Sequence, residues 1–486
     1  MLPYFLDLAD EIERRFDVAG WTSGDAGLWP LARMDLYLDL YWQELGGPPA
    51  PGSRVLRAAT HLMRPAANLW QQRRDAGKLL REPHPAEVVF LGDGVSLDRL
   101  DGMWEDRYGE PLLADYDAEG VSSFVMQAGD MRRAPLKRPT FAANLAEAAA
   151  RTSVSRYRRP LSLPDHAALM GYLARRGISA LSLAPERLAR RAAMLHATAE
   201  AFARILDRVQ PRIAFTVTWY AGLAPAFLLA CRRRGVLTVD LQHCPLEGRH
   251  KAYRWARLPK EGYALLPAVF WTWKEEDAAR LREWASGPWH RGLHGGHPRL
   301  LPFFDDEDPR TRQWDASFQT LAGPAGTRDV LVALQTIGGQ KEIWETLAKR
   351  VAASPTTWRW WIRRHPSGRP EDDALYGRLL SVSGPNIRLA EASALPLSAL
   401  LRHMSVVLSV SSGVAAEAAA FGVPAIFLNG DLDGLLPAIA ALPARPLRPA
   451  APFQPDLGFT LSLLDGMADE YRRLHTGGNF PWPASS

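Results

Sequence analysis

The sequence predicts an α/β protein built from two doubly wound parallel sheets. Short apolar runs alternate with longer helical patterns, and several of these runs lead directly into polar residues. The alternation stops near residue 300 and then begins again. Apolar runs of this kind are typical of buried parallel strands, and their alternation with helices predicts βαβ units.

The composition fits a folded protein of this length. Of the 486 residues, 47% are hydrophobic and 23% are charged, which is ordinary for a globular chain. The net charge of +5 is too small to indicate nucleic-acid binding by itself. It is explained as ordinary surface charge, and it also suits an anionic substrate or a weak attraction to an anionic membrane face. Acidic residues stand near the start, where a signal peptide needs a basic patch, and no apolar stretch approaches the roughly 18 residues of a membrane helix. We therefore expect a cytoplasmic protein.

The first half begins with a mainly helical region over residues 1–80. An apolar run over 87–92 then predicts a buried strand that ends in the turn Gly92-Asp93-Gly94. Further on we expect a helix over 185–210, a strand over 212–219, a helix over 224–234 and a strand over 236–241. Gly235 ends the second of these helices as a C-cap residue. A strand, a helix and a strand at this spacing predict a βαβ unit.

The second half follows a loop over 295–308 that is rich in glycine, proline and aspartate. Beyond it we expect strands over 329–334, 358–363, 405–409 and 422–428, with helices over 341–353, 395–403 and 413–421. This series predicts a second doubly wound sheet. The predicted domains are two Rossmann-like domains over 1–298 and 299–455, followed by a helix and tail over 456–486.

The most informative stretch is residues 405–424, where a buried strand ends in small hydroxyl residues and an alanine-rich helix begins. Backbone N–H groups at a helix start are available to an anion, and the helix dipole is positive there. Ser411 and Ser412 add hydroxyl donors for a phosphate, and Glu417 can accept hydrogen bonds from a ribose. Taken singly, Ser411 is also explained as a helix cap and Glu417 as a surface acid.

A second group suited to phosphate follows the strand over 358–363. Arg363, Arg364 and His365 stand at its carboxyl end, where ligands of open α/β sheets bind. Arginine can hold a phosphate through two hydrogen bonds. His365 is alternatively a structural histidine.

Two strand ends of the first half carry candidate acid/base groups. Asp93 is a candidate general base for a hydroxyl, or alternatively a turn residue that bonds its own backbone. His243 is the best acid/base candidate by its intrinsic pKa, and Glu247 is a weaker one. Gln242 is suited to orient a hydroxyl.

Several classes of protein are disfavoured. No Walker A pattern is present, and no Gly-x-Gly-x-x-Gly follows the first strand of either half, which argues against P-loop and nicotinamide enzymes. His250, His294 and His297 have no metal-ligand spacing, and neither do the two cysteines, Cys231 and Cys244. We therefore predict no metal site and no cofactor. A disulfide between the cysteines is possible, although nothing requires one.

These motifs resemble the GT-B glycosyltransferases, in particular the bacterial capsule and lipopolysaccharide transferases that use CMP-activated Kdo or sialic acid. In that group a His-Pro motif and a serine-rich motif hold the donor nucleotide and its phosphate, and His365-Pro366 and Ser411-Ser412 stand in those positions here. A Gln-His-Gly element also recurs in such families, and this chain has Gln242-His243 followed by Cys244. The resemblance implies two domains that face a cleft, with a last helix that returns to the first domain.

The resemblance further implies a metal-independent transferase. It would move a sugar from a nucleotide-activated, CMP-linked donor to a surface polysaccharide or glycolipid, at the inner face of the membrane. Asp93, His243 or Glu247 would supply the base, and residues 363–365, 411–412 and Glu417 would bind the donor. The alternatives are a nucleotide-sugar epimerase of the same architecture and an inactive module that binds glycan or serves as a scaffold.

Overall fold

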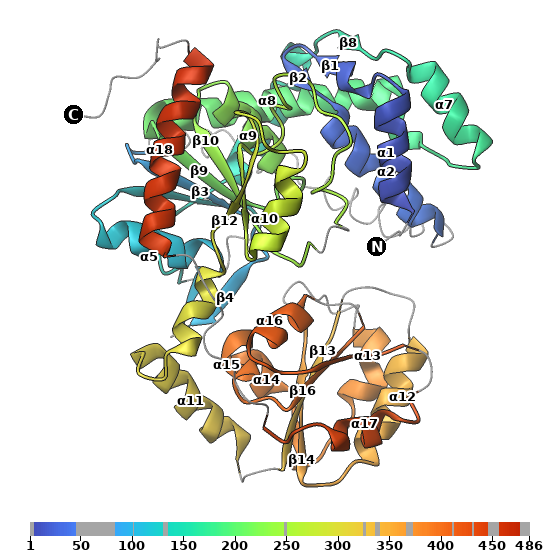
Figure 1. The fold of residues 1–486 in the computed structure, drawn as a ribbon, viewed down its shortest axis with the longest axis vertical. Coiled ribbons are helices and arrows are strands. Elements are labelled where there is room, and N and C mark those ends of the chain that lie inside the picture. Colours follow the sequence, from blue (N-terminus) through green and yellow to red (C-terminus); the bar gives the residue numbers. More distant parts are fainter. Residues whose placement is uncertain are drawn as a thin grey trace. The chain divides into compact units, whose positions relative to one another are not determined.

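The computed structural model describes residues 4–44, 83–100, 102–129, 135–246, 250–323, 327–335, 341–365, 373–410, 413–429, 432–445 and 456–476. The chain divides into two compact units. Unit 1 comprises Met1–Gly94, Tyr108–Gly296 and Pro455–Ser486, and unit 2 comprises Val95–Arg107 and His297–Gln454. Each unit contains one parallel sheet with helices on both faces (Figure 1). The predicted α/β class with two doubly wound sheets is therefore confirmed.

Unit 1 is built on a seven-stranded parallel sheet. In spatial order its strands are β7 (Thr140–Ala142), β6 (Ser123–Gln127), β3 (Val88–Gly92), β9 (Ile213–Val217), β10 (Leu237–Leu241), β11 (Val269–Thr272) and β12 (Arg291–His294). The chain runs outward from β3 to β7 and then continues from β9 on the other side of β3. The direction of winding therefore changes between β3 and β9, which is where ligands of such sheets bind.

Helices cover both faces of this sheet because the strand residues alternate between them. Val89 and Leu91 of β3 pack with the helices α8 and α9, whereas Val88 and Phe90 pack with α5 and α18. Figure 1 shows α18 lying along the sheet beside β10, β9 and β3. The helices of this part are α5 (Gly109–Ala118), α6 (Asn144–Arg151), α7 (His166–Arg175), α8 (Pro185–Val209), α9 (Ala224–Arg232), α10 (Glu275–Arg282) and α18 (Leu457–Thr476).

The N-terminal region packs against α8 through the same core. Its main helices are α1 (Phe5–Arg15) and α2 (Trp29–Glu44), and the short strands β1 (Thr22–Ser23), β2 (Ala26–Gly27) and β8 (Leu161–Ser162) form a small antiparallel sheet. Unit 1 also contains three short 3₁₀ helices, which are η1 (Val18–Gly20), η2 (Val154–Tyr157) and η3 (Leu181–Leu183). The two helices are joined by a buried ion pair, in which Arg33 Nη1 lies 3.0 Å from Glu13 Oε1.

Unit 2 is built on a five-stranded parallel sheet. Its strands in spatial order are β15 (Ile387–Arg388), β14 (Trp358–Arg363), β13 (Arg328–Ala333), β16 (Val406–Ser409) and β17 (Ala425–Phe427). Its helices are η4 (Pro298–Phe304), α11 (Pro309–Ala322), α12 (Lys341–Ala352), α13 (Asp373–Leu380), α14 (Ala390–Ala394), α15 (Leu397–Leu401), α16 (Val414–Ala420) and α17 (Leu435–Ala441). Here the winding changes direction between β13 and β16.

The hairpin of β4 (Leu97–Leu100) and β5 (Met103–Asp106) also belongs to unit 2. The domain boundaries predicted from the sequence assign this segment to the domain over 1–298. The structure groups it with unit 2, where Asp98 Oδ2 accepts a hydrogen bond of 2.6 Å from Arg299 Nη2. An ion pair between residues so far apart in the chain leaves no periodic signal in the sequence.

The helix expected over 395–403 is shorter than predicted. α14 ends before Leu395, whose backbone is extended with ψ at 150°, and α15 begins after Pro396. The ring of a proline disfavours helical geometry in the residue before it. This explains why Leu395 cannot continue a helix. Among the described helices, none combines the length and apolar character that crossing a bilayer requires.

Candidate functional sites

The candidate site of unit 1 lies at the carboxyl ends of β3, β9 and β10. Asp93 follows β3, Tyr220 follows β9 and His243 follows β10. These three strands are neighbours in one parallel sheet, so the three side chains start from the same edge. The turn after β3 requires glycine at Gly94, because its φ is +77° and a Cβ there would lie 2.1 Å from the carbonyl oxygen of Ala128.

A strained turn after β9 brings Tyr220 into this site. Thr218 has a φ of +59°, which a β-branched residue rarely adopts. The next backbone N–H, that of Trp219, donates to Asp240 Oδ1 at 3.0 Å, and Tyr253 Oη donates to Asp240 Oδ2 at 2.6 Å. Because Asp240 belongs to β10, these bonds hold the turn after β9 against the neighbouring strand. The strain at Thr218 is an observed feature of the kind that accumulates at functional sites.

His243 is surrounded by polar atoms of unit 1. Its Nε2 lies 3.2 Å from Tyr220 Oη and 3.6 Å from Cys244 Sγ. The same Tyr220 oxygen lies 3.4 Å from Nε2 of His250. The carbonyl oxygen of His243 accepts a hydrogen bond from Tyr108 Oη at 3.0 Å. The histidine is therefore held by contacts to its main chain and to its ring.

Burial keeps this histidine neutral. It lowers the pKa of His243 to about 4, and the nearby charge of Asp93 opposes the shift while Lys251 adds to it. Burial likewise lowers the pKa of His250 to about 2, with Lys251 again adding to the effect. A neutral imidazole has a lone pair and can accept a proton from a hydroxyl group. The structure thus places Asp93 and His243, which are 150 positions apart, within electrostatic range of each other.

Two other predicted residues of this half have different outcomes. Gln242 is buried and its amide is bonded within the protein, because its Oε1 accepts from the N–H of Trp273 at 2.8 Å and its Nε2 donates to the carbonyl of Cys244 at 2.8 Å. The expectation that Gln242 orients a hydroxyl is wrong, and this side chain instead fixes the loop that carries His243. Glu247 lies outside the described residues. Both Cys231 and Cys244 are free thiols in the structure.

Asp240 should make the stability of unit 1 depend on pH. Burial raises the pKa of Asp240 to about 7, although hydrogen bonds from Tyr253 and Trp219 oppose the shift. Because the folded pKa lies above the unfolded value of about 4, the stabilising contribution is complete below that value and is lost as the pH rises toward 7. We expect the free energy of unfolding of wild type, relative to that of Asp240→Asn, to fall by up to about 1.4 kcal/mol per pH unit in this window. Urea unfolding at several pH values measures this difference, and a flat difference would show that Asp240 stays ionised in the fold.

The candidate site of unit 2 lies at the carboxyl ends of β14, β13 and β16. The strand order places β14 and β16 on either side of β13, so the carboxyl ends of β14 and β16 lie at one edge of the sheet, about 10 Å apart at a spacing of roughly 4.8 Å per strand. Arg364 and His365 are exposed in the loop after β14. Ser411, Ser412 and Pro366 lie outside the described residues.

The guanidinium group of Arg363 is hydrogen-bonded to main-chain atoms of unit 2. Its Nη1 donates to the carbonyl oxygens of Ala392 and Leu395 at 2.5 and 2.6 Å. Burial lowers the pKa of Arg363 to about 10, and the charge of Asp98 opposes this shift. Arg363 therefore remains a cation at neutral pH while it holds the segment between α14 and α15.

Glu417 faces a second buried arginine. Its Oε2 lies 3.9 Å from Arg299 Nη1, and the two side chains are only 9% and 7% exposed. Neither of these two atoms has a hydrogen-bond partner among the described residues. A buried donor and a buried acceptor that have no hydrogen-bond partner lower the stability of the fold, unless a bound group lies between them and bonds to both. A hydroxyl group suits this gap, because it can accept from the guanidinium and donate to the carboxylate.

Arg299 is itself positioned by the β4–β5 hairpin. Asp98 accepts from Arg299 and, at 2.8 Å, from Arg107. Burial would raise the pKa of Asp98, but the charges of Arg299 and Arg107 outweigh it and hold that pKa below its usual value. Arg299 and Asp98 are not expected from the sequence, because neither stands at the end of a predicted strand. Tyr220 was also not expected, although it follows a predicted strand end, as Asp93 does.

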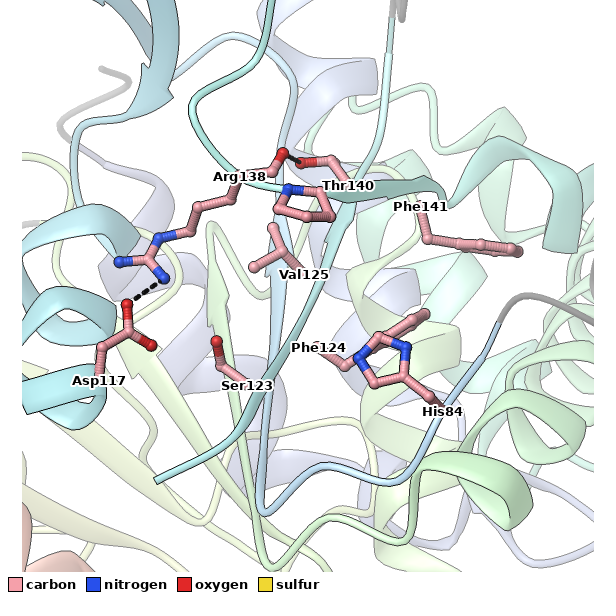
Figure 2. Close-up of a pocket in the computed structure, with 9 residues that line it drawn as sticks. His84, Asp117, Ser123, Phe124, Val125, Arg138, Thr140 and Phe141 are labelled. Carbon is pink, nitrogen blue, oxygen red and sulfur yellow. Dashed lines mark hydrogen bonds and ion pairs between the residues drawn. The ribbon is translucent and has the colours of Figure 1, made fainter. Parts of the chain in front are cut away.

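A separate pocket of about 490 Å³ lies in unit 1 at the other end of the sheet. Ser123, Phe124 and Val125 from the first half of β6 line it, together with Arg138 and Asp117, which form the ion pair drawn in Figure 2. Ligands of open α/β sheets bind at the carboxyl ends of the strands. This pocket therefore lies apart from the polar cluster around His243.

No protein-family model matches the chain, and no curated protein matches it in sequence. Among solved structures, the UDP-GlcNAc 2-epimerase of Neisseria meningitidis bound to UDP-GlcNAc is 13% identical with a TM-score of 0.40, and the match covers 80% of this chain and 93% of that one. The S. aureus MnaA–UDP structure is 11% identical with a TM-score of 0.40 and coverages of 72% and 81%. The wall teichoic acid polymerase TagF is 10% identical with a TM-score of 0.43 and coverages of 88% and 92%.

Proposed function

We propose that this protein is a glycosyltransferase of the GT-B type, which moves a sugar from a nucleotide-activated donor to a hydroxyl group of an acceptor. The observation that carries the proposal is the neutral, half-buried His243 at the point where the sheet of unit 1 changes its direction of winding. Asp93 and Tyr220 lie around it. A neutral imidazole with a carboxylate nearby is a general base for a hydroxyl group.

In this mechanism each unit contributes one part of the reaction. His243 takes the proton of the acceptor hydroxyl, and the negative charge of Asp93 stabilises the imidazolium that forms. The acceptor oxygen forms a bond to the anomeric carbon, and the bond from that carbon to the phosphate oxygen breaks. The nucleotide leaves with the electron pair, and cations of unit 2 such as Arg364 stabilise its charge.

The gap between Arg299 and Glu417 supports a nucleotide in unit 2. A ribose carries neighbouring hydroxyl groups, each of which can accept from the Nη1 of Arg299 and donate to the Oε2 of Glu417. The resemblance of the His365-Pro366 and Ser411-Ser412 motifs favours a CMP-linked donor. It also favours a surface polysaccharide or glycolipid as the acceptor, at the inner face of the membrane.

A nucleotide should raise the thermal midpoint of the full chain, because a ligand that binds only the folded state stabilises it. In a panel of CMP, CDP, UDP and GDP we expect the largest rise with CMP. At a fixed concentration of CMP, the rise in thermal midpoint should be smaller in Arg299→Met and in Glu417→Gln than in wild type. The rise of each variant is measured from its own midpoint without nucleotide. The exposed residues Arg310 and Glu342 provide matched controls as Arg310→Met and Glu342→Gln, which should keep the wild-type rise. No rise with any nucleotide would contradict the proposal and favour a module without catalytic activity.

One observation favours a second candidate, a nucleotide-sugar epimerase. Asp240, whose pKa is raised by burial to about 7, and Asp93 both act on Tyr220, so two carboxylates lie near one hydroxyl group. Such a pair can remove and return protons. Incubation with the nucleotide sugar alone separates the two functions, because an epimerase turns over without an acceptor and a transferase requires one.

A further inference from the structure

We propose that His243, Cys244 and His250 form a binding site for a zinc-type divalent cation. Their ligand atoms, two imidazole nitrogens and one sulfur, all lie within 4.8 Å of one another. The spacing of His250 matches no metal-ligand motif, because the fold, rather than a short motif, brings this residue to His243 and Cys244. Imidazole and thiolate are the ligands that Zn²⁺ prefers in proteins.

The distances around Tyr220 fit a tetrahedral ion. With bonds of about 2.0–2.1 Å to nitrogen and about 2.3 Å to sulfur, the ligand atoms of such an ion lie roughly 3.3–3.6 Å apart. Nε2 of His243 lies 3.6 Å from Cys244 Sγ and 3.2 Å from Tyr220 Oη, and that oxygen lies 3.4 Å from Nε2 of His250. Three edges of the tetrahedron are therefore already close to their final lengths. In this arrangement the oxygen of Tyr220, which lies near both histidine nitrogens, would supply the fourth ligand.

Packing holds the ring of His250. The ring lies against Tyr253 with centroids 5.0 Å apart, and its Nε2 lies 3.4 Å from Tyr220 Oη. Without an ion, Nδ1 accepts a hydrogen bond from the backbone N–H of Ala252 at 3.3 Å. An ion on Nε2 requires the ring proton on Nδ1, so metal binding would break this long hydrogen bond.

The charges near the cluster have both signs. The ammonium group of Lys251 acts on His243, His250 and Cys244 and opposes a cation. The carboxylates of Asp240 and Asp277 act on Cys244, and that of Asp93 acts on His243. Removal of the ammonium should therefore strengthen metal binding, and Lys251→Met tests this directly.

Cobalt substitution measures the site without any activity assay. We expect the full, untagged chain to bind a single Co²⁺ with the visible bands of tetrahedral coordination and a cobalt–thiolate charge-transfer band, both of which Zn²⁺ abolishes. Cys244→Ser should remove the thiolate band, and His243→Ala or His250→Ala should weaken binding at least about 10-fold. Cys231→Ala, which removes the buried cysteine outside the cluster, is the matched control and should keep every band.

The proposal is overturned if the wild-type chain shows no thiolate band, or if the band survives in Cys244→Ser and disappears in Cys231→Ala. A functional consequence rests on the proposed function, because an ion on Nε2 of His243 occupies the lone pair of the base. Zn²⁺ should then inhibit sugar transfer, and a chelator should restore it. A chain that binds Co²⁺ but transfers no sugar would overturn the proposed function and leave the metal site intact.

Discussion

Replacement of His243 by glutamine should lower the rate of sugar transfer by about 10²–10⁴-fold, the usual contribution of a general base. Glutamine keeps a polar side chain of similar length, but its amide cannot accept a proton at neutral pH. The nucleotide contacts proposed for unit 2 are unchanged, so the rise in thermal midpoint with nucleotide should stay at its wild-type value. Transfer rates at saturating donor, measured beside that rise, separate loss of chemistry from loss of binding.

His250→Gln is the matched comparison, because His250 is a buried histidine beside the same tyrosine oxygen. We expect it to change the transfer rate by less than a tenth of the effect of His243→Gln. The assay is run with a chelator, so that metal binding does not contribute. Nearly full activity in His243→Gln would exclude this histidine as the base and leave Asp93 as the candidate.

Loss of the carboxylate of Glu13 should destabilise unit 1 by about 3–5 kcal/mol, as breaking a buried ion pair does. Oε1 of Glu13 accepts from Arg33 Nη1 and from Trp29 Nε1, both at 3.0 Å, and its Oε2 accepts from the N–H of Ala256 at 2.7 Å. The side chains of Glu13 and Arg33 are 1% and 0% exposed. In Glu13→Ala the guanidinium stays buried without its counter-ion. Urea unfolding of the full chain measures the loss.

A double variant distinguishes the ion pair from simple loss of packing. Glu13→Leu combined with Arg33→Met replaces both charges by apolar groups of similar size, which is often neutral or stabilising. We expect it to recover most of the stability lost in Glu13→Ala. Glu11→Gln, which removes an exposed partner of Arg176, is the control and should have a far smaller effect. Equal losses in the single and double variants would show that shape, rather than charge, holds α1 to α2.

The helices and strands that carry the candidate sites could be predicted because their signals are local. The apolar run before Asp93 and the run before His243 form β3 and β10, and those of the second half form β13, β14, β16 and β17. The strands β6, β7, β11 and β12 were not expected, and neither was the short β15. The helix expected over 395–403 was also predicted too long. It begins only at Leu397, after Pro396, which lies inside the predicted range.

The candidate residues show where local reasoning stops. A polar residue after a buried strand can be found from the sequence, and this rule led to Asp93 and His243. It could not find Arg299, whose role depends on Asp98 from a hairpin that is 201 positions away. It also gave Gln242 the wrong role, because only the fold shows that both ends of its amide are bonded within the protein.

The sequence by itself determined the class of the fold and the strand ends at which chemistry can occur, because burial and helical periodicity are written into neighbouring residues. Only the tertiary structure decided which of these groups meet. It placed His250, Cys244 and Tyr220 around His243, and it set Arg299 opposite Glu417. The physical reason is that pKa values, buried ion pairs and metal ligands depend on distances of a few ångströms between residues far apart in the chain, and spacing along a sequence carries no record of them.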